Sequence, residues 1–296
     1  MKININQYFL TESIKTKIEK VTICFSIIGF LVHLTLIILA YYNVINYDAE
    51  GLLKNPISSI YTPFSFILFY EVYLLIYYLP KSTSKYIGKQ YEIITLIIIR
   101  KVFKDLGNLN LEENFFKSTS DLQFLIDLGT VLILFALILV FYKLNKEQSR
   151  AEVEVTISKE IQLFITFKKW VAFLLVPLFF TLSAISLTGW VKASFYNSVN
   201  IIALAADTNK IFFDNFFTTL IVTDVLILLF SFLLTDKFQT VMRNSGFIIT
   251  TILIKISFGA VGVVNNIMVI TALLFGVCIL YIYNKYNQLL DDTNKK

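Results

Sequence analysis

The stretch FSFILFYEVYLLIYYLP (residues 64–80) carries a single charged residue, Glu71, in the middle of an apolar run. A second run, TTLIVTDVLILLFSFLLTD (residues 218–236), carries Asp224 at its centre. A lone charge inside hydrocarbon costs at least about 2.5–3.5 kcal/mol, so such residues face the protein interior and find partners there. The two stretches therefore predict an all-α polytopic membrane protein with a charged core.

The composition supports this fold class. Of the 296 residues, 56% are hydrophobic and only 16% are charged, and the mean hydropathy is +0.70. Soluble domains carry roughly 25% charged residues, so this chain has too little polar surface for a water-soluble fold. Few Gly and many Ile, Phe, Tyr, Lys and Asn residues favour an AT-rich bacterial genome as the source.

Eight segments are long enough to cross a bilayer, which takes about 20 apolar residues. The third and the seventh each carry a basic residue towards one end, and the alternative is that both are re-entrant or interfacial, which gives six spans. The predicted spans are residues 20–43, 62–80, 88–106, 123–142, 169–190, 215–235, 245–263 and 266–284.

The distribution of Lys and Arg predicts the orientation, because these residues collect on the cytoplasmic side. Residues 1–19, 143–168 and 288–296 become cytoplasmic when the N-terminus is inside, and the loops on the opposite side, 44–61 and 191–214, are poorer in Lys. Residues 1–19 are polar and precede the first apolar run, which predicts a signal anchor and not a cleaved leader. We expect a multi-pass protein of the cell (inner) membrane with both termini cytoplasmic.

The two halves resemble each other. Residues 93–103 (IITLIIIRKVF) align without gaps on residues 248–258 (IITTILIKISF), so that Arg100 matches Lys255. Glu71 and Asp224 match with a slip of two residues. The sequence thus predicts two four-helix membrane repeats, residues 20–142 and 169–287, in parallel orientation.

The linker between the halves, residues 143–168, alternates apolar and polar positions. Apolar residues occupy the odd positions 153–157 and 161–167, with Lys159 between the two runs, which is the period of a β-strand. We expect a small cytoplasmic β-hairpin with strands at about 151–158 and 161–167. The alternative is an amphipathic interfacial helix that leads into the fifth span.

Intramembrane charges are the candidate site residues. Glu71 is expected to pair with Arg100, Asp224 with Lys255, and Asp127 with one of two lysines near the outer end of the third span, Lys101 or Lys104. Three interpretations stay open: a buried staple that fixes helix register, a hydrated conduit lined by these groups, and a voltage-responsive element. A basic helix beside an acidic span is similar to voltage-sensor domains, although the arginines at every third residue are absent.

Supporting roles fall to three further residues. Tyr70 and Tyr73 are expected to hydrogen-bond Glu71, and His33 to be a packed, neutral imidazole bonded to a neighbouring helix rather than a proton relay. One histidine and two cysteines do not make a metal site, and no catalytic or nucleotide-binding motif is present in the sequence. We expect no enzyme, no cofactor and no nucleic-acid partner.

These features favour an oligomeric ion-conducting channel or pore, with the acid–base pairs near the conduction path. Few Gly and Pro residues and bulky apolar side chains predict stiff packing, which counts against the alternative of a secondary transporter. A further alternative is a non-catalytic membrane partner or effector of a bacterial stress or defence system. The expected partners are the lipid bilayer, further copies of the chain, and a cytoplasmic protein or small molecule as regulator.

Overall fold

The computed structural model describes residues 10–42, 59–106, 119–151, 159–196, 201–233 and 237–294. Within these ranges the regular secondary structure is entirely helical. The eight helices are α1 (Glu12–Tyr41), α2 (Tyr61–Tyr78), α3 (Thr83–Leu106), α4 (Thr119–Ala151), α5 (Lys159–Tyr196), α6 (Ile201–Phe232), α7 (Phe238–Gly259) and α8 (Val263–Asn294).

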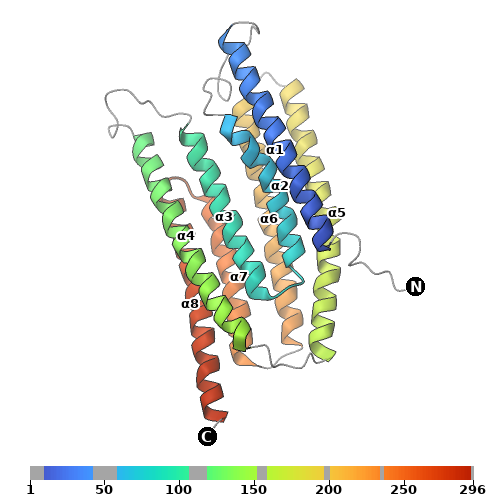
Figure 1. The fold of residues 1–296 in the computed structure, drawn as a ribbon, viewed down its shortest axis with the longest axis vertical. Coiled ribbons are helices and arrows are strands. Elements are labelled where there is room, and N and C mark those ends of the chain that lie inside the picture. The colour runs from blue at the N-terminus through green and yellow to red at the C-terminus, as the bar shows by residue number, and fades with distance from the viewer. Residues whose placement is uncertain are drawn as a thin grey trace, which may run out of the picture.

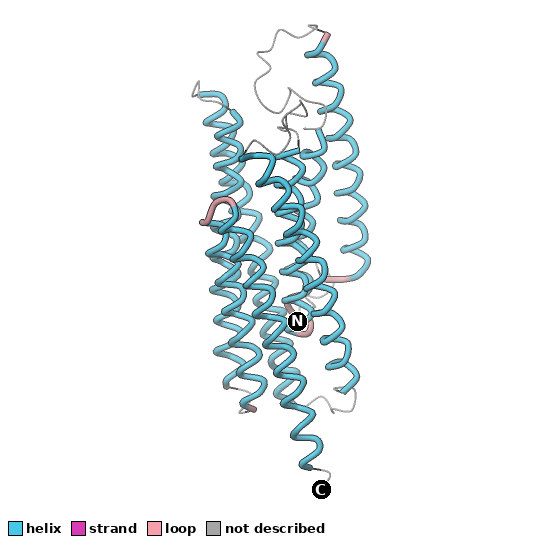
Figure 2. Tube along the Cα trace, turned by 90° about the vertical axis from the view of Figure 1, so that its left-hand side faces the viewer, coloured by secondary structure: helices cyan, strands magenta, loops and turns pink. Residues whose placement is uncertain are grey.

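The helices form two rows that pack face to face (Figure 1). Consecutive helices are neighbours within each half, α1 to α4 in one row and α5 to α8 in the other. Between the rows, α4 packs on α8, α3 on α7 and α2 on α5. Figure 2, turned by 90°, shows all helices following the long axis of the bundle. The interior therefore lies between the rows, where α3 and α7 have most of their surface covered.

Two hydrogen bonds fix the direction and register of α8 against α4. Asn266 donates to Asp127, 139 positions away, and Asn284 donates to the carbonyl oxygen of Leu144, 140 positions away. A nearly constant separation means that the two helices run parallel. α4 and α8, the last helices of the two halves, thus share one orientation, while an internal repeat stays a prediction.

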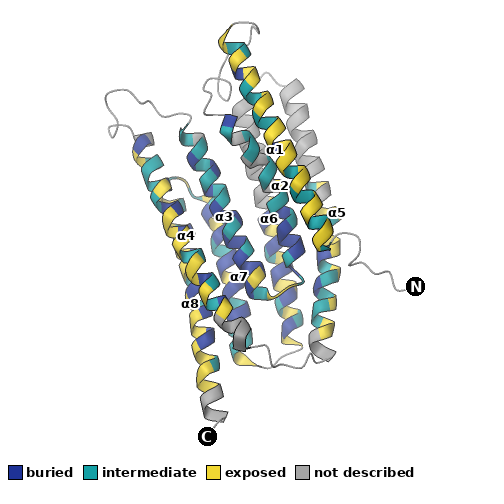
Figure 3. Ribbon diagram, viewed as in Figure 1, coloured by how far each residue is buried: buried dark blue, intermediate teal, exposed yellow. Residues whose placement is uncertain are grey.

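Among the described residues, six helices are long and apolar enough to cross a membrane: α1, α4, α5, α6, α7 and α8. The chain is a multi-pass membrane protein. The seventh predicted span is among the six, so its helix is long and apolar enough to cross the membrane. α2 and α3 are outside this set, and Figure 3 shows α3 mostly buried and α2 mostly half-buried. Whether these two helices cross fully stays a prediction.

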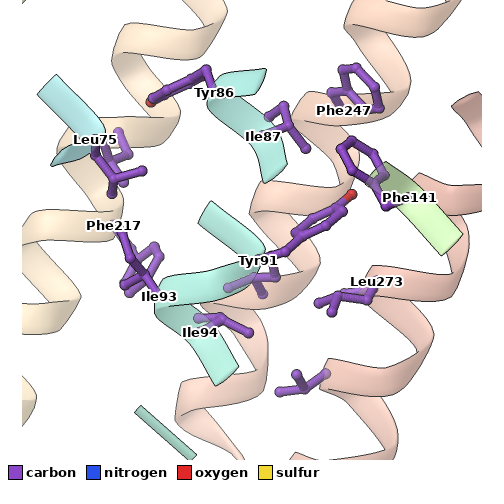
Figure 4. Close-up of a cluster of buried hydrophobic side chains, with 14 of the residues drawn as sticks. Leu75, Tyr86, Ile87, Tyr91, Ile93, Ile94, Phe141, Phe217, Phe247 and Leu273 are labelled. Carbon is purple, nitrogen blue, oxygen red and sulfur yellow. The ribbon is translucent and has the colours of Figure 1, made fainter. Parts of the chain in front are cut away.

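An apolar layer fills the middle of the bundle, where α2, α3, α6 and α7 meet (Figure 4). Its fully buried side chains come from both rows: Leu75, Ile93, Ile94, Phe217, Leu220 and Ile254. The outer helices instead expose large apolar side chains, such as Leu132 on α4 and Leu174 on α5. Because lipid tails are as apolar as leucine, helices at the lipid boundary are apolar on all sides.

The prediction of a β-hairpin is wrong in its second strand. Residues 161–167 lie in α5, and α4 continues to Ala151; most of the first strand, 152–158, is outside the described residues. Phe167 stacks on Phe230 of α6 with ring centroids 4.1 Å apart, whereas Leu163 is exposed. Alternation of apolar residues does not indicate a strand here, because a helix at a lipid boundary tolerates apolar residues on every face. The alternative, a helix leading into the fifth span, agrees with α5.

The turn between α7 and α8 is tight. α7 ends at Gly259 and α8 begins at Val263. Gly262 has a φ of 66°, which favours glycine. Asn265 closes the turn by donating to the carbonyl oxygen of Ser257 at 2.7 Å. A Cβ on Gly259 would meet nothing within 4 Å, so that glycine is not required for close helix packing.

Candidate functional site, the polar core around α3

α3 is a polar helix surrounded by apolar ones. It packs against α2 and α4 in its own row and against α7 in the other. Polar groups removed from water must find partners inside the protein. The side chains that need such partners on α3 are Ser84, Tyr86, Gln90, Tyr91, Thr95 and Arg100, all buried.

The first polar group links three helices and is called the Asp224 network, consisting of Asp224, Gln90 and Thr251. The side-chain amide nitrogen of Gln90 on α3 donates to Asp224 Oδ2 on α6 at 3.2 Å. The amide oxygen of Gln90 accepts a hydrogen bond of 2.8 Å from the hydroxyl of Thr251 on α7. All three side chains are buried. The network therefore joins the first half of the chain to the second.

A pocket beside Asp224 is lined by polar side chains from four helices. Lys168 of α5 is buried there, and its Nζ donates to the carbonyl oxygen of Lys81 at 3.3 Å and to the Thr83 hydroxyl at 3.2 Å. Lys168 and Asp224 both line the pocket but form no direct ion pair. The lining comprises Leu79, Thr83, Tyr86, Ile87, Lys168, Asp224, Ile227, Leu228, Asn244, Phe247 and Ile248. Lys81 is exposed at the α2–α3 turn, so Lys168 connects the pocket with that turn, in the lower half of the bundle in Figure 1.

Two more polar groups border this pocket. The hydroxyl of Tyr86 lies beside Asp224 and Gln90, and it is buried without a hydrogen-bond partner. Arg243 of α7 is near enough to act electrostatically on Lys168, and its guanidinium carbon lies 4.5 Å from the ring centroid of Tyr283. The pocket thus holds one carboxylate among several groups that donate hydrogen bonds.

Glu71 belongs to a second polar group, between α2, α3 and α4. Its charged neighbours are Lys89 and Glu92, which form an ion pair of 2.5 Å with each other. Tyr142 of α4 donates a short hydrogen bond to Glu92. Gly88 makes room for this tyrosine, because a Cβ there would lie 3.0 Å from the Tyr142 ring.

The helix register does not bring Glu71 to Arg100, which the sequence pairs. α2 ends at Tyr78 and α3 starts at Thr83, so the two helices are antiparallel around a short turn. Along the axis, Arg100 lies about ten residues, or roughly 15 Å, from the level of Glu71. The prediction placed the start of the third span at residue 88, whereas the helix begins a full turn earlier. Arg100 itself is buried.

Asp127 is the centre of the third group, the Asp127 cluster, which consists of Asp127, Lys101, Gln123 and Asn266. Lys101 Nζ lies 2.9 Å from Asp127 Oδ2, so Lys101 is one of the two expected partners found in place. Gln123 and Asn266 donate to Asp127 Oδ1 at 2.6 and 2.5 Å. The carboxylate is fully buried. The side chain of the other expected partner, Lys104, is outside the described residues.

The second expected acid–base pair is also arranged differently. The charged neighbour of Asp224 is Lys168 and not Lys255. Lys255 lies one turn further along α7 than Thr251 and is partly exposed. The sequence placed Lys168 in a cytoplasmic linker and did not single out Gln90 or Thr251. A signal for Gln90 was nevertheless present, since it is an uncharged amide near the start of a predicted span.

Of the three residues with predicted supporting roles, only His33 has the predicted kind of partner among the hydrogen bonds described here. His33 Nδ1 lies 2.5 Å from the Thr62 hydroxyl of α2, which confirms the expected bond to a neighbouring helix. The Tyr70 hydroxyl donates to Glu19 at 3.1 Å and not to Glu71. The Tyr73 ring packs between the rings of Tyr70 and Tyr77.

A stripe of polar residues on α1, spaced by seven, explains why Tyr70 turns away from Glu71. The first two members, Glu12 and Glu19, accept hydrogen bonds from Tyr77 and Tyr70 at 2.8 and 3.1 Å. A spacing of seven keeps residues on one helix face. The stripe comprises Glu12, Glu19, Ser26 and His33, and every member contacts α2 or the carbonyl of Pro63 at its start.

Among the described residues, no group of three or more His, Cys, Asp or Glu side chains is placed to hold a metal ion. Comparison with known proteins finds no family model, no curated protein and no solved structure that matches this chain. The chemistry that the polar core offers is hydrogen bonding and proton exchange around buried carboxylates.

Proposed function

We propose that this chain moves an ion across the membrane along a path inside its own helix bundle. The observation that carries the proposal is the Asp224 network with its pocket, which places a buried carboxylate between the two halves. An ionisable residue inside a membrane protein is a functional candidate, because keeping it there is costly. Lys168 extends the polar path from this carboxylate to the α2–α3 turn.

The apolar layer suggests that the proposed ion path is closed in this structure. Gln90 of the Asp224 network and Lys101 of the Asp127 cluster are eleven positions apart on α3, which corresponds to about 16 Å along the axis. Between them, Ile93 and Ile94 are fully buried against the second row. Apolar constrictions close ion paths by excluding water. Opening would require α3 to move relative to α6 and α7.

An ion channel is the first candidate within this proposal, and the apolar layer would be its gate. The oligomer expected from the sequence stays a prediction, because a path inside one chain does not depend on it. A secondary transporter is the second candidate. It is favoured by the contribution of both halves to one site, with α3 from the first and α5, α6 and α7 from the second, as in transporters that bind their substrate between repeats.

The orientation that we propose has the lower end of the bundle in the cytoplasm of a bacterial cell. Lys81, Lys85 and Lys237 are exposed at that end, and the described turn at the opposite end, residues 260–262, carries no charge. Positively charged loops stay inside. The polar pocket would then open towards the cytoplasm.

Reconstitution tests the proposal. Purified protein is placed in planar bilayers and in vesicles, and currents and ion uptake are compared with those of Asp224→Asn and Gln90→Leu. Glu12→Gln, at the exposed end of α1, is the matched control. Unitary currents altered by the first two changes support a channel, and saturable uptake driven by a gradient supports a transporter. If folded protein gives neither signal, the proposal is overturned and the partner or effector alternative is favoured.

A further inference from the structure

We propose that the Asp224 network is a proton-exchange site, in which Asp224 takes up and releases H⁺ while Gln90 and Thr251 change hydrogen-bond partners. This inference identifies the transported ion as H⁺, and its link to transport rests on the proposed function. The protonation itself is measurable without transport.

The groups around Asp224 do not suit a metal cation. Gln90, Tyr86 and Thr251 are its uncharged neighbours, and Lys168 is the charged one. The Gln90 amide presents its nitrogen, since its oxygen is taken by the Thr251 hydroxyl. Hard cations need several oxygen ligands that accept and do not donate. A carboxylate surrounded by donors is instead a place for a proton to be bound or lost.

In the first state Asp224 is ionised. The amide nitrogen of Gln90 donates to the carboxylate, and the Thr251 hydroxyl donates to the amide oxygen. Thr251 has a second acceptor within reach, the carbonyl oxygen of Phe247 one turn earlier at 3.2 Å. A hydroxyl has one hydrogen, so it donates to one of these acceptors at a time.

In the second state Asp224 carries the proton. The Gln90 amide turns by 180°, which its shape permits because its oxygen and nitrogen occupy equivalent positions. The carboxyl O–H then donates to the amide oxygen, the amide nitrogen donates to Thr251 Oγ1, and the Thr251 hydroxyl donates to Phe247. One proton is added, no covalent bond of the protein is broken, and the two hydrogen bonds of the first state are replaced so that every member of the network keeps a partner.

This two-state property separates a proton site from a structural staple. A buried polar group left without a partner is costly, so a network that satisfies only one protonation state resists titration. Here each state satisfies Asp224, Gln90 and Thr251. Because the three residues lie on α6, α3 and α7, a proton arriving at Asp224 changes contacts across both halves of the bundle.

Lys168 provides the route for the proton. Its ammonium group shares the pocket with Asp224, and transfer of one proton gives a neutral amine and a neutral carboxyl group. The other groups that face the site are Tyr86 of α3, whose hydroxyl has no partner, and Arg243 of α7, which acts on Lys168. The facing residues Asn244 and Thr251 of α7 are uncharged.

Infrared difference spectroscopy of the full chain in lipid vesicles tests the inference. The stretching band of a protonated carboxyl group is followed between about pH 4 and pH 9, a range that covers carboxyl titration in proteins. We expect a band that grows as the pH falls and is lost in Asp224→Asn. Gln90→Leu removes the amide partner from both forms, and because the hydrogen bond to the ionised form is the stronger one, the midpoint should rise by about one pH unit.

Thr130→Val is the matched control, because the Thr130 hydroxyl is buried and bonds only to the Ile126 carbonyl of its own helix. It should leave the band and its midpoint unchanged. A wild-type band that does not change with pH while circular dichroism shows folded protein overturns the inference, as does a band that survives in Asp224→Asn. A titrating Asp224 without ion flux supports the proton site and overturns only the transport function.

Discussion

Asn266 donates a hydrogen bond of 2.5 Å to Asp127, and this contact joins the start of α8 to α4 across 139 positions of sequence. The same carboxylate is held by Gln123 and Lys101, so the Asp127 cluster ties α3, α4 and α8 together at one level. It lies directly beside the α7–α8 turn, where a Cβ on Gly262 would lie 3.4 Å from Gln123 Oε1.

The Asp127 cluster should dominate the stability of this end of the bundle. Asp127→Ala removes the shared acceptor from three donors, and breaking a buried pair in this way costs about 3–5 kcal/mol. Asn266→Ala removes one neutral donor and should cost about 1–3 kcal/mol. Thermal unfolding in detergent measures both. Thr271→Val, an exposed position on α8 whose hydroxyl bonds only to its own helix, is the control. Equal effects of the three changes would contradict the role of the cluster.

Gly276 lets α8 pack against the Tyr91 side chain of α3. A Cβ there would overlap the Tyr91 hydroxyl and lie 3.2 Å from Thr250 Oγ1. Gly276→Ala should therefore destabilise the fold by about 1–3 kcal/mol through overpacking. Tyr91→Phe should restore most of that loss, because the Tyr91 hydroxyl is buried without a hydrogen bond and its removal makes room.

Gly129 supplies the matched control for this prediction, which is also measured by thermal unfolding. A Cβ at Gly129 would meet nothing within 4 Å. Because alanine is the better helix former, Gly129→Ala should raise stability by about 0.5–1 kcal/mol. If Gly276→Ala and Gly129→Ala changed stability in the same direction, the close contact of α8 with Tyr91 would be refuted.

The polar stripe on α1 should contribute through specific pairs. Glu19→Gln and Tyr70→Phe, alone and together, form a double-mutant cycle on the 3.1 Å bond between these side chains. We expect a coupling free energy of about 0.5–1.5 kcal/mol, because the acceptor is a carboxylate. Thr16→Val combined with Tyr70→Phe is the control, since the Thr16 hydroxyl bonds only to the Glu12 carbonyl. Additive effects in the first cycle would rule out the pair.

Much of the fold follows from the sequence because membrane spans depend on local composition. The eight helices and the tight turn before Val263 needed only runs of apolar residues and a glycine. The prediction of a β-hairpin in the linker was wrong because it also relied on local composition. Alternation of apolar and polar residues indicates a strand only where one face meets water, and residues 161–167 lie in a helix with exposed apolar side chains. Helix starts are also poorly marked, since polar residues such as those after Thr83 can lie inside the bundle.

The carboxylates of the candidate site were predicted, but most of their partners were not. Asp127 and Lys101 lie close in the sequence and were matched, whereas the partner of Asp224 comes from 134 positions away. An error of one helical turn at the start of α3 was enough to misplace Arg100 against Glu71. Partners such as Gln90 and Lys168 depend on how the two rows stack, and that stacking leaves no periodic signal in the sequence.

The side of the membrane on which each turn lies can be measured directly. Val261, in the turn between α7 and α8, is 85% exposed, and Lys81 is exposed at the α2–α3 turn. These turns lie at opposite ends of the bundle (Figure 1). Val261→Cys should react with a membrane-impermeant thiol reagent added to intact cells, and Lys81→Cys only after permeabilisation, because positive turns stay inside.

The labelling needs a background without Cys24 and Cys278, since both thiols are exposed on the bundle surface. Each variant is compared with the same protein carrying no cysteine, and with permeabilised cells as the reference for full reaction. Because α2 and α3 meet at Lys81, its protection in intact cells and reaction after permeabilisation would place the α2–α3 turn on the cytoplasmic side. Reaction of Lys81→Cys from outside, or protection of Val261→Cys, would refute the orientation and with it a pocket that opens towards the cytoplasm.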